Sequence, residues 1–176
     1  SIPGLYRFLR KLGIMAVHPP NPKYIPKPYE QMDYPGQRIQ VDVKFVPSAC
    51  LKNPKVIGKQ FFQYTAIDEY SRWRFVEAFE EHNTYSSAMF IEHLVKAFPL
   101  PIQCIQTDNG AEFTNRFTTY RDKPTLFQVH LKQHGICHKV IRPFTPRHNG
   151  KVERSHRKDN ERFYATHTFY SFEDFA

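Results

Sequence analysis

The sequence predicts an α/β fold, one domain in which helices flank a mixed five-stranded sheet. Three observations lead to this prediction. Apolar and polar residues alternate in the first part of the chain, as they do in strands with one buried face. Apolar residues then recur at helical spacing from position 84, and further short apolar segments alternate with helices after that. A chain of 176 residues, 40% hydrophobic and 15% aromatic, is large enough to enclose one core.

An antiparallel meander of three strands is expected first. Residues 39–45 alternate apolar residues with Gln40, Asp42 and Lys44, so the polar side chains share one face. Residues 60–67 and 73–79 predict the second and third strands. The polar residues 68–71 between them fit a tight turn, which makes these two strands a hairpin.

Helices and two parallel strands follow the meander. Thr84 is positioned to cap a helix that ends before Pro99. Short apolar segments at 102–106 and 136–141 predict buried parallel strands, with a helix over 126–134 between them. A long basic helix is expected over 151–164. The order of elements makes the complete sheet three antiparallel strands plus two parallel ones.

The chain divides into three segments. Residues 1–36 contain the remnant of a helix at 5–12, stopped by Gly13, and a linker with five prolines between positions 19 and 28. Residues 37–165 form the globular core, and residues 166–176 begin a truncated C-terminal segment. The chain starts without Met or a signal-peptide pattern, so we expect a piece of a longer protein.

Composition and charge exclude some classes of protein. No apolar run is long enough to span a membrane, and three scattered cysteines predict free thiols in a reducing compartment. The net charge is +8, and its excess lies in two segments. Residues 139–162 hold eight basic against three acidic residues, and residues 1–30 hold five against one. Such clustering favours a polyanionic partner such as nucleic acid over an evenly solvated surface.

Three acidic residues stand where local structure does not require them. Asp42 lies in mid-strand, where Asp is disfavoured. Asp108 directly follows a parallel strand, at the sheet edge where α/β proteins bind ligands. Glu153 lies in the first turn of the basic helix. If the first strand and the 102–106 strand are neighbours, these carboxylates converge and need a cation. Ligand sets of oxygen alone select Mg²⁺ or Mn²⁺ over Zn²⁺.

Four motifs in this order resemble the catalytic core of retroviral integrases and bacterial insertion-sequence transposases, the DDE enzymes with a ribonuclease-H-like fold. The four motifs are Ile39-Gln-Val-Asp-Val, Tyr64-Thr-Ala-Ile-Asp-Glu-Tyr-Ser-Arg-Trp, Thr107-Asp-Asn-Gly-Ala-Glu-Phe and Pro143-Phe-Thr-Pro-Arg-His-Asn-Gly-Lys-Val-Glu-Arg. The resemblance covers most of the chain and is closer to the bacterial transposases. The 44 residues between Asp108 and Glu153 exceed the compact family spacing, and we assign the excess to a surface loop at 118–125.

The resemblance implies a polynucleotidyl transferase that works by two-metal phosphoryl transfer during transposition, DNA integration and recombination. Asp42, Asp108 and Glu153 would be both the catalytic residues and the ligands of two Mg²⁺ or Mn²⁺ ions, with Asp42 bridging the pair. Water would first nick one strand at the end of the element, and the freed 3′-hydroxyl would then attack target DNA. The implied partners are transposon ends and target DNA, bound by a homodimer or higher oligomer. The implied location is the bacterial cytoplasm, on the nucleoid when the protein is bound to DNA.

Further residues receive expected roles beside this triad. Residues on or next to the basic helix are expected to contact DNA: Asn149, Lys151, Arg154, Arg157 and Lys158. Asn109 and Glu112 are expected to hold the metal-binding residues in position without binding the metal themselves. Glu112 is also the nearest rival to Glu153 as the third ligand, but it follows Asp108 by only four positions.

Three other interpretations are weighed against this one. A ribonuclease-H-type nuclease would need a further acid on the first core helix, where Glu92 is available. A catalytically degenerate DNA-binding module would not need an intact triad. A zinc site could use His130, His134, Cys137 and His138. We disfavour zinc because residues 137 and 138 point to opposite faces of a predicted strand and because no Cys-x-x-Cys partner exists.

Overall fold

The structure is a computed structural model that describes residues 2–14, 30–142 and 149–176. The chain forms two compact units, Ser1–Glu30 and Gln31–Ala176, and each is considered by itself. The first unit contains helix α1 (Ile2–Lys11), which begins three residues before the predicted helix. Gly13 ends this helix with φ +67°, a left-handed conformation that glycine adopts without strain. The proline-rich linker lies outside the described residues.

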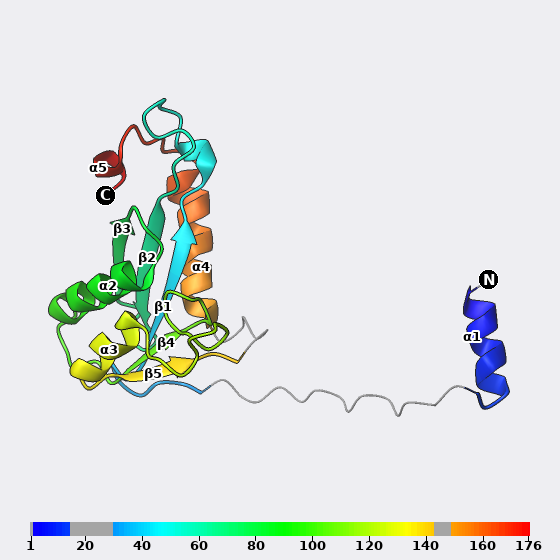
Figure 1. Cartoon of the computed structure of the whole chain (residues 1–176). Helices are drawn as coiled ribbons and strands as arrows, with labels where there is room; N and C mark the ends of the chain where they lie inside the picture. The colour runs from blue at the N-terminus through cyan, green and yellow to red at the C-terminus, as the bar shows by residue number, and fades with distance from the viewer. Residues whose placement is uncertain (1, 15–29, 143–148) are drawn as a thin grey trace. The chain divides into compact units, whose positions relative to one another are not determined.

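The second unit is built on a five-stranded sheet in the order β3-β2-β1-β4-β5 (Figure 1). Its strands are β1 (Ile39–Phe45), β2 (Phe62–Asp68), β3 (Arg74–Phe79), β4 (Cys104–Thr107) and β5 (Cys137–Val140). β1 pairs antiparallel with β2, and β2 with β3. β4 runs parallel to both β1 and β5. The predicted combination of a three-strand meander with two parallel strands is confirmed.

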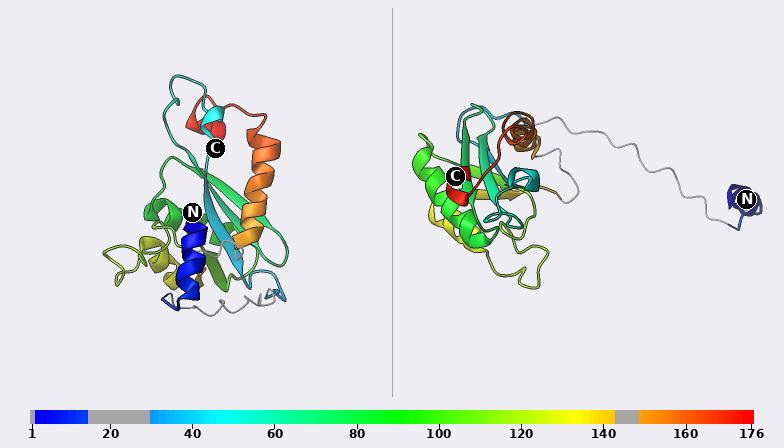
Figure 2. Two further views of the ribbon diagram at one scale, coloured as in Figure 1. Left: turned by 90° about the vertical axis from the view of Figure 1, so that its right-hand side faces the viewer. Right: turned by 90° about the horizontal axis from the view of Figure 1, so that it is seen from above.

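Helices cover the two faces of this sheet unequally (Figures 1 and 2). Helices α2 (Thr84–Ala97) and α3 (Leu126–Gln133) pack on one face. Helix α4 (Gly150–Asp159) runs along the other face and continues as a π-helical turn, η3 (Asn160–Tyr164). The predicted basic helix therefore exists, but its last turn changes hydrogen-bond pattern.

One predicted cap is wrong. The cap of α2 is Asn83, whose side chain accepts a hydrogen bond from Ser86 N at 2.8 Å. Asn83 has extended backbone, as a capping residue does, whereas Thr84 is already helical. The Thr84 hydroxyl instead accepts from Phe127 N at 3.2 Å and so joins α2 to α3. Thr125 caps α3 and forms a reciprocal capping box with Gln128.

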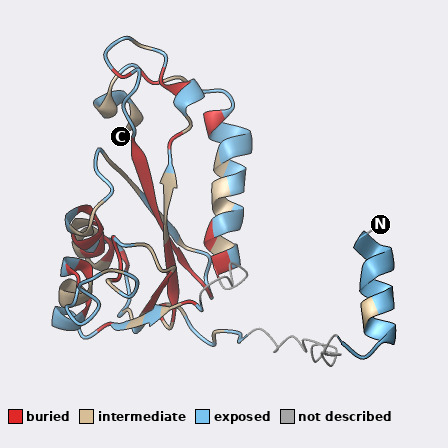
Figure 3. Ribbon diagram, turned by 45° about the vertical axis from the view of Figure 1, so that its right-hand side comes forward, coloured by how far each residue is buried: buried red, intermediate tan, exposed pale blue. Residues whose placement is uncertain are grey.

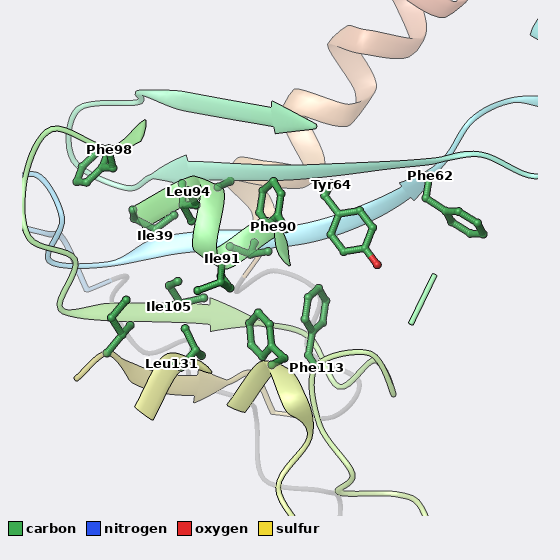
Figure 4. Close-up of a cluster of buried hydrophobic side chains, with 14 residues drawn as sticks. Ile39, Phe62, Tyr64, Phe90, Ile91, Leu94, Phe98, Ile105, Phe113 and Leu131 are labelled. Carbon is green, nitrogen blue, oxygen red and sulfur yellow. The ribbon is translucent and has the colours of Figure 1, made fainter. Parts of the chain in front are cut away.

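The main core lies between the sheet and helices α2 and α3 (Figures 3 and 4). Ile39 and Val41 of β1 point into it, as alternation predicts, together with Phe90 and Ile91 of α2. Successive side chains of a strand point to opposite faces of the sheet, so Gln40, Asp42 and Lys44 point away from this core and toward α4.

A smaller apolar cluster lies beyond the end of β1 and the start of β2, where it includes Val46 and Phe61. Helix η1 (Ser48–Cys50), the loop after it and the short helix α5 (Phe172–Phe175) contribute to it, with Phe169 buried at 3% exposure. Phe169 N donates to Cys50 O at 2.8 Å. Residues 166–176 thus pack on the core unit, and the boundary placed at 165 stays a prediction. No described helix is long and apolar enough to cross a membrane.

Candidate active site

Three acidic residues belong to three elements that pack together near the middle of the sheet: β1, the loop after β4, and α4. Register places Gln40 of β1 beside Gln106 of β4, so Asp42 and Asp108, each two residues further, lie on the same face. Glu153 lies in the first turn of α4, which packs on that face of β1. The backbone thus places the three residues on one side of the sheet, but the described residues hold no group of three His, Cys, Asp or Glu side chains arranged around a metal ion, so their convergence stays a prediction. Their roles as catalytic and metal-binding residues stay predictions.

The electrostatics of this part of the sheet disfavour ionised carboxylates. Burial raises the pKa of Asp42 to about 7, and the negative charges of Asp108, Glu153 and Glu112 act in the same direction. Burial also raises the pKa of Asp108, again with help from Glu112. The Gly110 N–H, which donates to Asp108 Oδ1 at 2.9 Å, partly offsets that effect. A positive ion placed here would remove the mutual repulsion.

The loop after β4 holds Asp108 in place. A Cβ atom on Gly110 would lie 2.3 Å from Glu112 Oε1, so the carboxylate packs directly against this glycine. Glu112 is 8% exposed and pairs with His82 Nε2 at 2.9 Å, and this hydrogen bond raises the pKa of His82. Asn109 donates to Ile141 O at 3.0 Å, beyond the end of β5. These contacts agree with the supporting roles expected for Asn109 and Glu112, which stay predictions.

Sequence reasoning missed His156, which faces Asp42 from α4. Its Nδ1 lies 3.5 Å from Asp42 Oδ2, and its side chain is 12% exposed. Burial lowers the pKa of His156 to about 4, and the positive charge of Lys44 adds to the shift. The imidazole is therefore neutral near pH 7. The available signal was its spacing, because a residue three positions after Glu153 lies on the same face of a helix.

The residues expected to contact DNA fall into two groups. Arg154, Arg157 and Lys158 are exposed on α4 and form no ion pair with the described part of the chain. Asn149 is only 2% exposed, and Lys151 is drawn inward, its Nζ 3.2 Å from Glu69 Oε2. All five DNA contacts stay predictions, but only the first group presents its charge to solvent.

The histidine cluster considered for zinc has other partners. Glu92 Oε1 lies 2.7 Å from His130 Nδ1 and 2.8 Å from His134 Nε2, which joins α2 to α3. His138 lies 2.9 Å from the Thr107 hydroxyl. Glu92 is thus engaged on the face of the sheet opposite α4, so the ribonuclease-H alternative gains no fourth carboxylate from it. Within 2–14, 30–142 and 149–176, no three His, Cys, Asp or Glu side chains are arranged to hold a metal ion.

A comparison with protein families shows which family the chain belongs to. Residues 33–146 match the integrase core domain family. The chain belongs to the integrase core domain family. The match begins before β1 and ends before α4, so it includes Asp42 and Asp108 but not Glu153. The resemblance inferred from the four motifs is confirmed.

One relative of this integrase core is named an integrase, and another is named a retrovirus-related Pol polyprotein. A protein of Spiroplasma virus SpV1-C74 named putative integrase ORF3 is 29% identical over 133 residues, which cover 71% of this chain and 35% of that protein. The retrovirus-related Pol polyprotein from transposon RE2 of Arabidopsis thaliana is 32% identical over 93 residues, 52% of this chain and 6% of that protein. The integrase core thus spans about a third or less of these relatives.

Solved structures share the fold of this integrase core. A chain of the simian T-cell lymphotropic virus intasome, in complex with PP2A regulatory subunit B56 gamma, superposes with a TM-score of 0.63 at 17% identity. The match covers 82% of this chain and 46% of that one. The HTLV-2 integrase catalytic core domain in complex with magnesium, in its dimeric form, gives 0.52 at 18% identity, covering 72% and 69%. The predicted ribonuclease-H-like fold is confirmed.

Proposed function

We propose that the chain is the catalytic core of a DDE transposase or integrase that cleaves DNA strands at element ends and joins them to target DNA. Asp42, Asp108 and Glu153 are its catalytic residues and metal ligands. The proposal is carried by the match of residues 33–146 to the integrase core domain family, together with packing that places α4 and the loop after β4 beside Asp42. Burial raises the pKa of Asp42 to about 7, and the charges of Asp108 and Glu153 add to the shift. Structural ion pairing has the opposite effect on a carboxylate, so this cluster has the electrostatics of an active site.

The donor chemistry fits a hard divalent cation. Three carboxylates offer oxygen only, and their repulsion is relieved by Mg²⁺ or Mn²⁺. When bound, such ions would supply Lewis-acid activation of the attacking hydroxyl and of the leaving oxygen of the phosphodiester. Asp42 and Asp108 would hold such ions from the sheet and Glu153 from α4, once the three side chains, which do not surround one point in the described structure, close around the metal.

The remaining residues bind and orient DNA. Helix α4 carries Glu153 together with three basic residues, Arg154, Arg157 and Lys158. A DNA phosphate backbone bound by these three side chains would therefore lie close to the carboxylates. The neutral His156 fills the space between α4 and Asp42 without adding charge to the metal site.

The organisation of the whole protein follows from this proposal. Residues 1–36 are an N-terminal segment, residues 37–165 are the catalytic core, and residues 166–176 are a C-terminal segment. Transposon ends and target DNA are the partners. The active form is a homodimer or higher oligomer, because two element ends must be joined together. The expected location is the bacterial cytoplasm, on the nucleoid during transposition.

The test uses three isosteric variants, Asp42→Asn, Asp108→Asn and Glu153→Gln. Each is expected to abolish nicking and strand transfer on DNA that carries the element's end, and to weaken Mn²⁺ binding measured by calorimetry, while circular dichroism stays unchanged. Glu161→Gln is the matched control, because Glu161 is a second exposed glutamate eight residues along the same helical segment. Wild-type strand transfer by any triad variant contradicts the proposal. Cleavage of RNA–DNA hybrid but not of DNA ends would assign the chain to the ribonuclease-H class instead.

A further inference from the structure

The first turn of α4 is capped by a side chain from the sheet. The residue at the capping position, Asn149, makes no side-chain hydrogen bond to the helix. Gln40 of β1 takes its place, and its Oε1 accepts from Lys151 N at 3.1 Å and from Val152 N at 3.2 Å. The first backbone N–H groups of a helix have no partner within the helix, so this cap satisfies two of them.

The Gln40 amide is itself held by Glu69. Gln40 is fully buried, and its Nε2 donates to Glu69 Oε1 at 2.9 Å. Because a carboxylate only accepts hydrogen bonds, the amide nitrogen must face Glu69 and the amide oxygen must face α4. The direction of the cap is therefore determined by Glu69.

Two cations hold Glu69 in turn. This carboxylate is 2% exposed at the start of the turn that joins β2 to β3. Arg38 donates to it from Nε at 2.7 Å and from Nη2 at 3.1 Å. Lys151 Nζ lies 3.2 Å from Oε2 and donates to Glu69 O at 2.8 Å. A buried carboxylate with two cationic donors has little freedom to move.

This network connects the two elements that carry the proposed metal ligands. Gln40 precedes Asp42 by two positions, on the same face of β1. The two N–H groups that it caps belong to the residues directly before Glu153. A single amide therefore links the first turn of α4 to the strand that carries Asp42.

We propose that Gln40, oriented by Glu69, is a positioning residue that sets Glu153 against Asp42 for metal binding. This inference rests on the proposed function. Gln40 acts through the α4 backbone and does not touch DNA. The same network gives Lys151 a role in holding Glu69.

The chain offers a matched control at the other end of α4. Gln63 of β2 is 4% exposed and also lies on the α4 face of the sheet. Its Nε2 donates to Asp159 Oδ2 at 2.8 Å and to Thr65 Oγ1 at 2.9 Å. Gln63→Met and Gln40→Met thus remove the same group at the same depth, but only Gln40 reaches the first turn.

The experiment compares Gln40→Met with Gln63→Met in the full chain. We expect Gln40→Met to speed amide exchange at Lys151 and Val152 and to weaken Mn²⁺ binding, measured by calorimetry, by about 10-fold. In strand transfer kcat is expected to fall while KM for DNA stays unchanged. Gln63→Met is expected to leave Mn²⁺ affinity within about 2-fold of wild type. Equal Mn²⁺ affinity in the two variants overturns the inference, because general loosening of α4 would then explain any loss.

A charge-conserving swap supplies the rescue. In Gln40→Glu combined with Glu69→Gln, the carboxylate at position 40 accepts from the α4 N–H groups, where the helix dipole favours it, and the amide nitrogen at position 69 donates to that carboxylate. The amide oxygen at position 69 keeps the bonds from Arg38 Nη2 and Lys151 Nζ, while Arg38 Nε loses its acceptor at Oε1. We expect the swap to restore Mn²⁺ affinity to within about 3-fold, whereas Gln40→Glu alone, which brings two buried carboxylates together, loses it. If Gln40→Met does not fold, this comparison replaces it, and equal affinities overturn the inference.

The triad variants separate this inference from the proposed function. If Asp42→Asn binds Mn²⁺ as wild type does, the proposed metal site is wrong. If Asp42→Asn loses binding but Gln40→Met keeps it, only the positioning role is wrong.

Discussion

Replacing Asp42 by Asn is expected to stabilise the metal-free protein at neutral and alkaline pH. In the folded chain, burial and neighbouring carboxylates raise the pKa of Asp42 from 3.8 to about 7. A carboxyl group with a raised folded pKa binds its proton more tightly in the folded state than in the unfolded state. Its unfavourable contribution is therefore absent at low pH, grows between pH 4 and pH 7, and stays constant above that range.

The size of this effect follows from the two pKa values. A gap of about three pKa units at about 1.36 kcal/mol each sets a ceiling of about 4 kcal/mol above pH 7. The Asp42 side chain is 21% exposed, so water and counterions screen part of this energy. We expect Asp42→Asn to raise the free energy of unfolding by about 1–3 kcal/mol at pH 8. An Asn keeps the oxygen that accepts from the Val43 backbone, so the substitution removes charge with little change of shape.

Urea denaturation in EDTA at pH 4, 6 and 8 measures the prediction. The stability difference between Asp42→Asn and wild type is expected to be small at pH 4 and to increase through pH 6 to pH 8. Asp122→Asn, at an exposed position in the 118–125 loop, is the control and is expected to show no such increase. A difference that does not change with pH, or a destabilised variant at pH 8, would refute the electrostatic account of this site.

Three further outcomes are expected. Mg²⁺ is expected to raise the melting temperature of wild type more at pH 8 than at pH 5, because it binds ionised carboxylates. The melting temperature of Asp42→Asn is expected to change little with Mg²⁺, and equal shifts in the two proteins would contradict this. Arg154→Met is expected to reduce the slope of log DNA affinity against log salt by about 0.9, the value for one phosphate contact, whereas Lys151→Met, which removes an ammonium engaged by Glu69, leaves the slope in place. If Lys151→Met reduced the slope and Arg154→Met did not, Lys151 would be the phosphate contact. Gly110→Ala is expected to push the Glu112 carboxylate away from its present position and so to lower the pKa of His82 toward its ordinary value, which NMR titration would measure. An unchanged His82 pKa would show that the Glu112–His82 contact does not depend on Gly110.

Local patterns determined most of the secondary structure. The alternation over 39–45 predicts β1 residue for residue, because a strand with one buried face must repeat every two positions. The strand predicted over 102–106 is shorter in the structure, Cys104–Thr107. Gln103 lies before the ladder, and its N–H donates to Gly36 O at 2.8 Å. A partner so far away in sequence leaves no local pattern.

The candidate site shows the same division. Asp42, Asp108 and Glu153 could be selected from sequence, because each stands where local structure has no need of an acid. The spacing of His156 from Glu153 shows only a shared helix face. Its 3.5 Å approach to a strand more than one hundred residues earlier could not be predicted from that spacing. Lys151 was expected on DNA with its basic neighbours, and only packing shows its ammonium against Glu69.

The sequence by itself predicted the fold class and the order of the elements, and it proposed the three carboxylates, because hydrophobic periodicity and residue type are properties of short segments. The tertiary structure alone decided that Gln40 caps α4, that Glu69 orients Gln40, and that burial beside other acids raises the pKa of Asp42. These features depend on distances between segments far apart in the chain. Packing of α4 on the sheet creates those distances, and with them the electrostatics of the site.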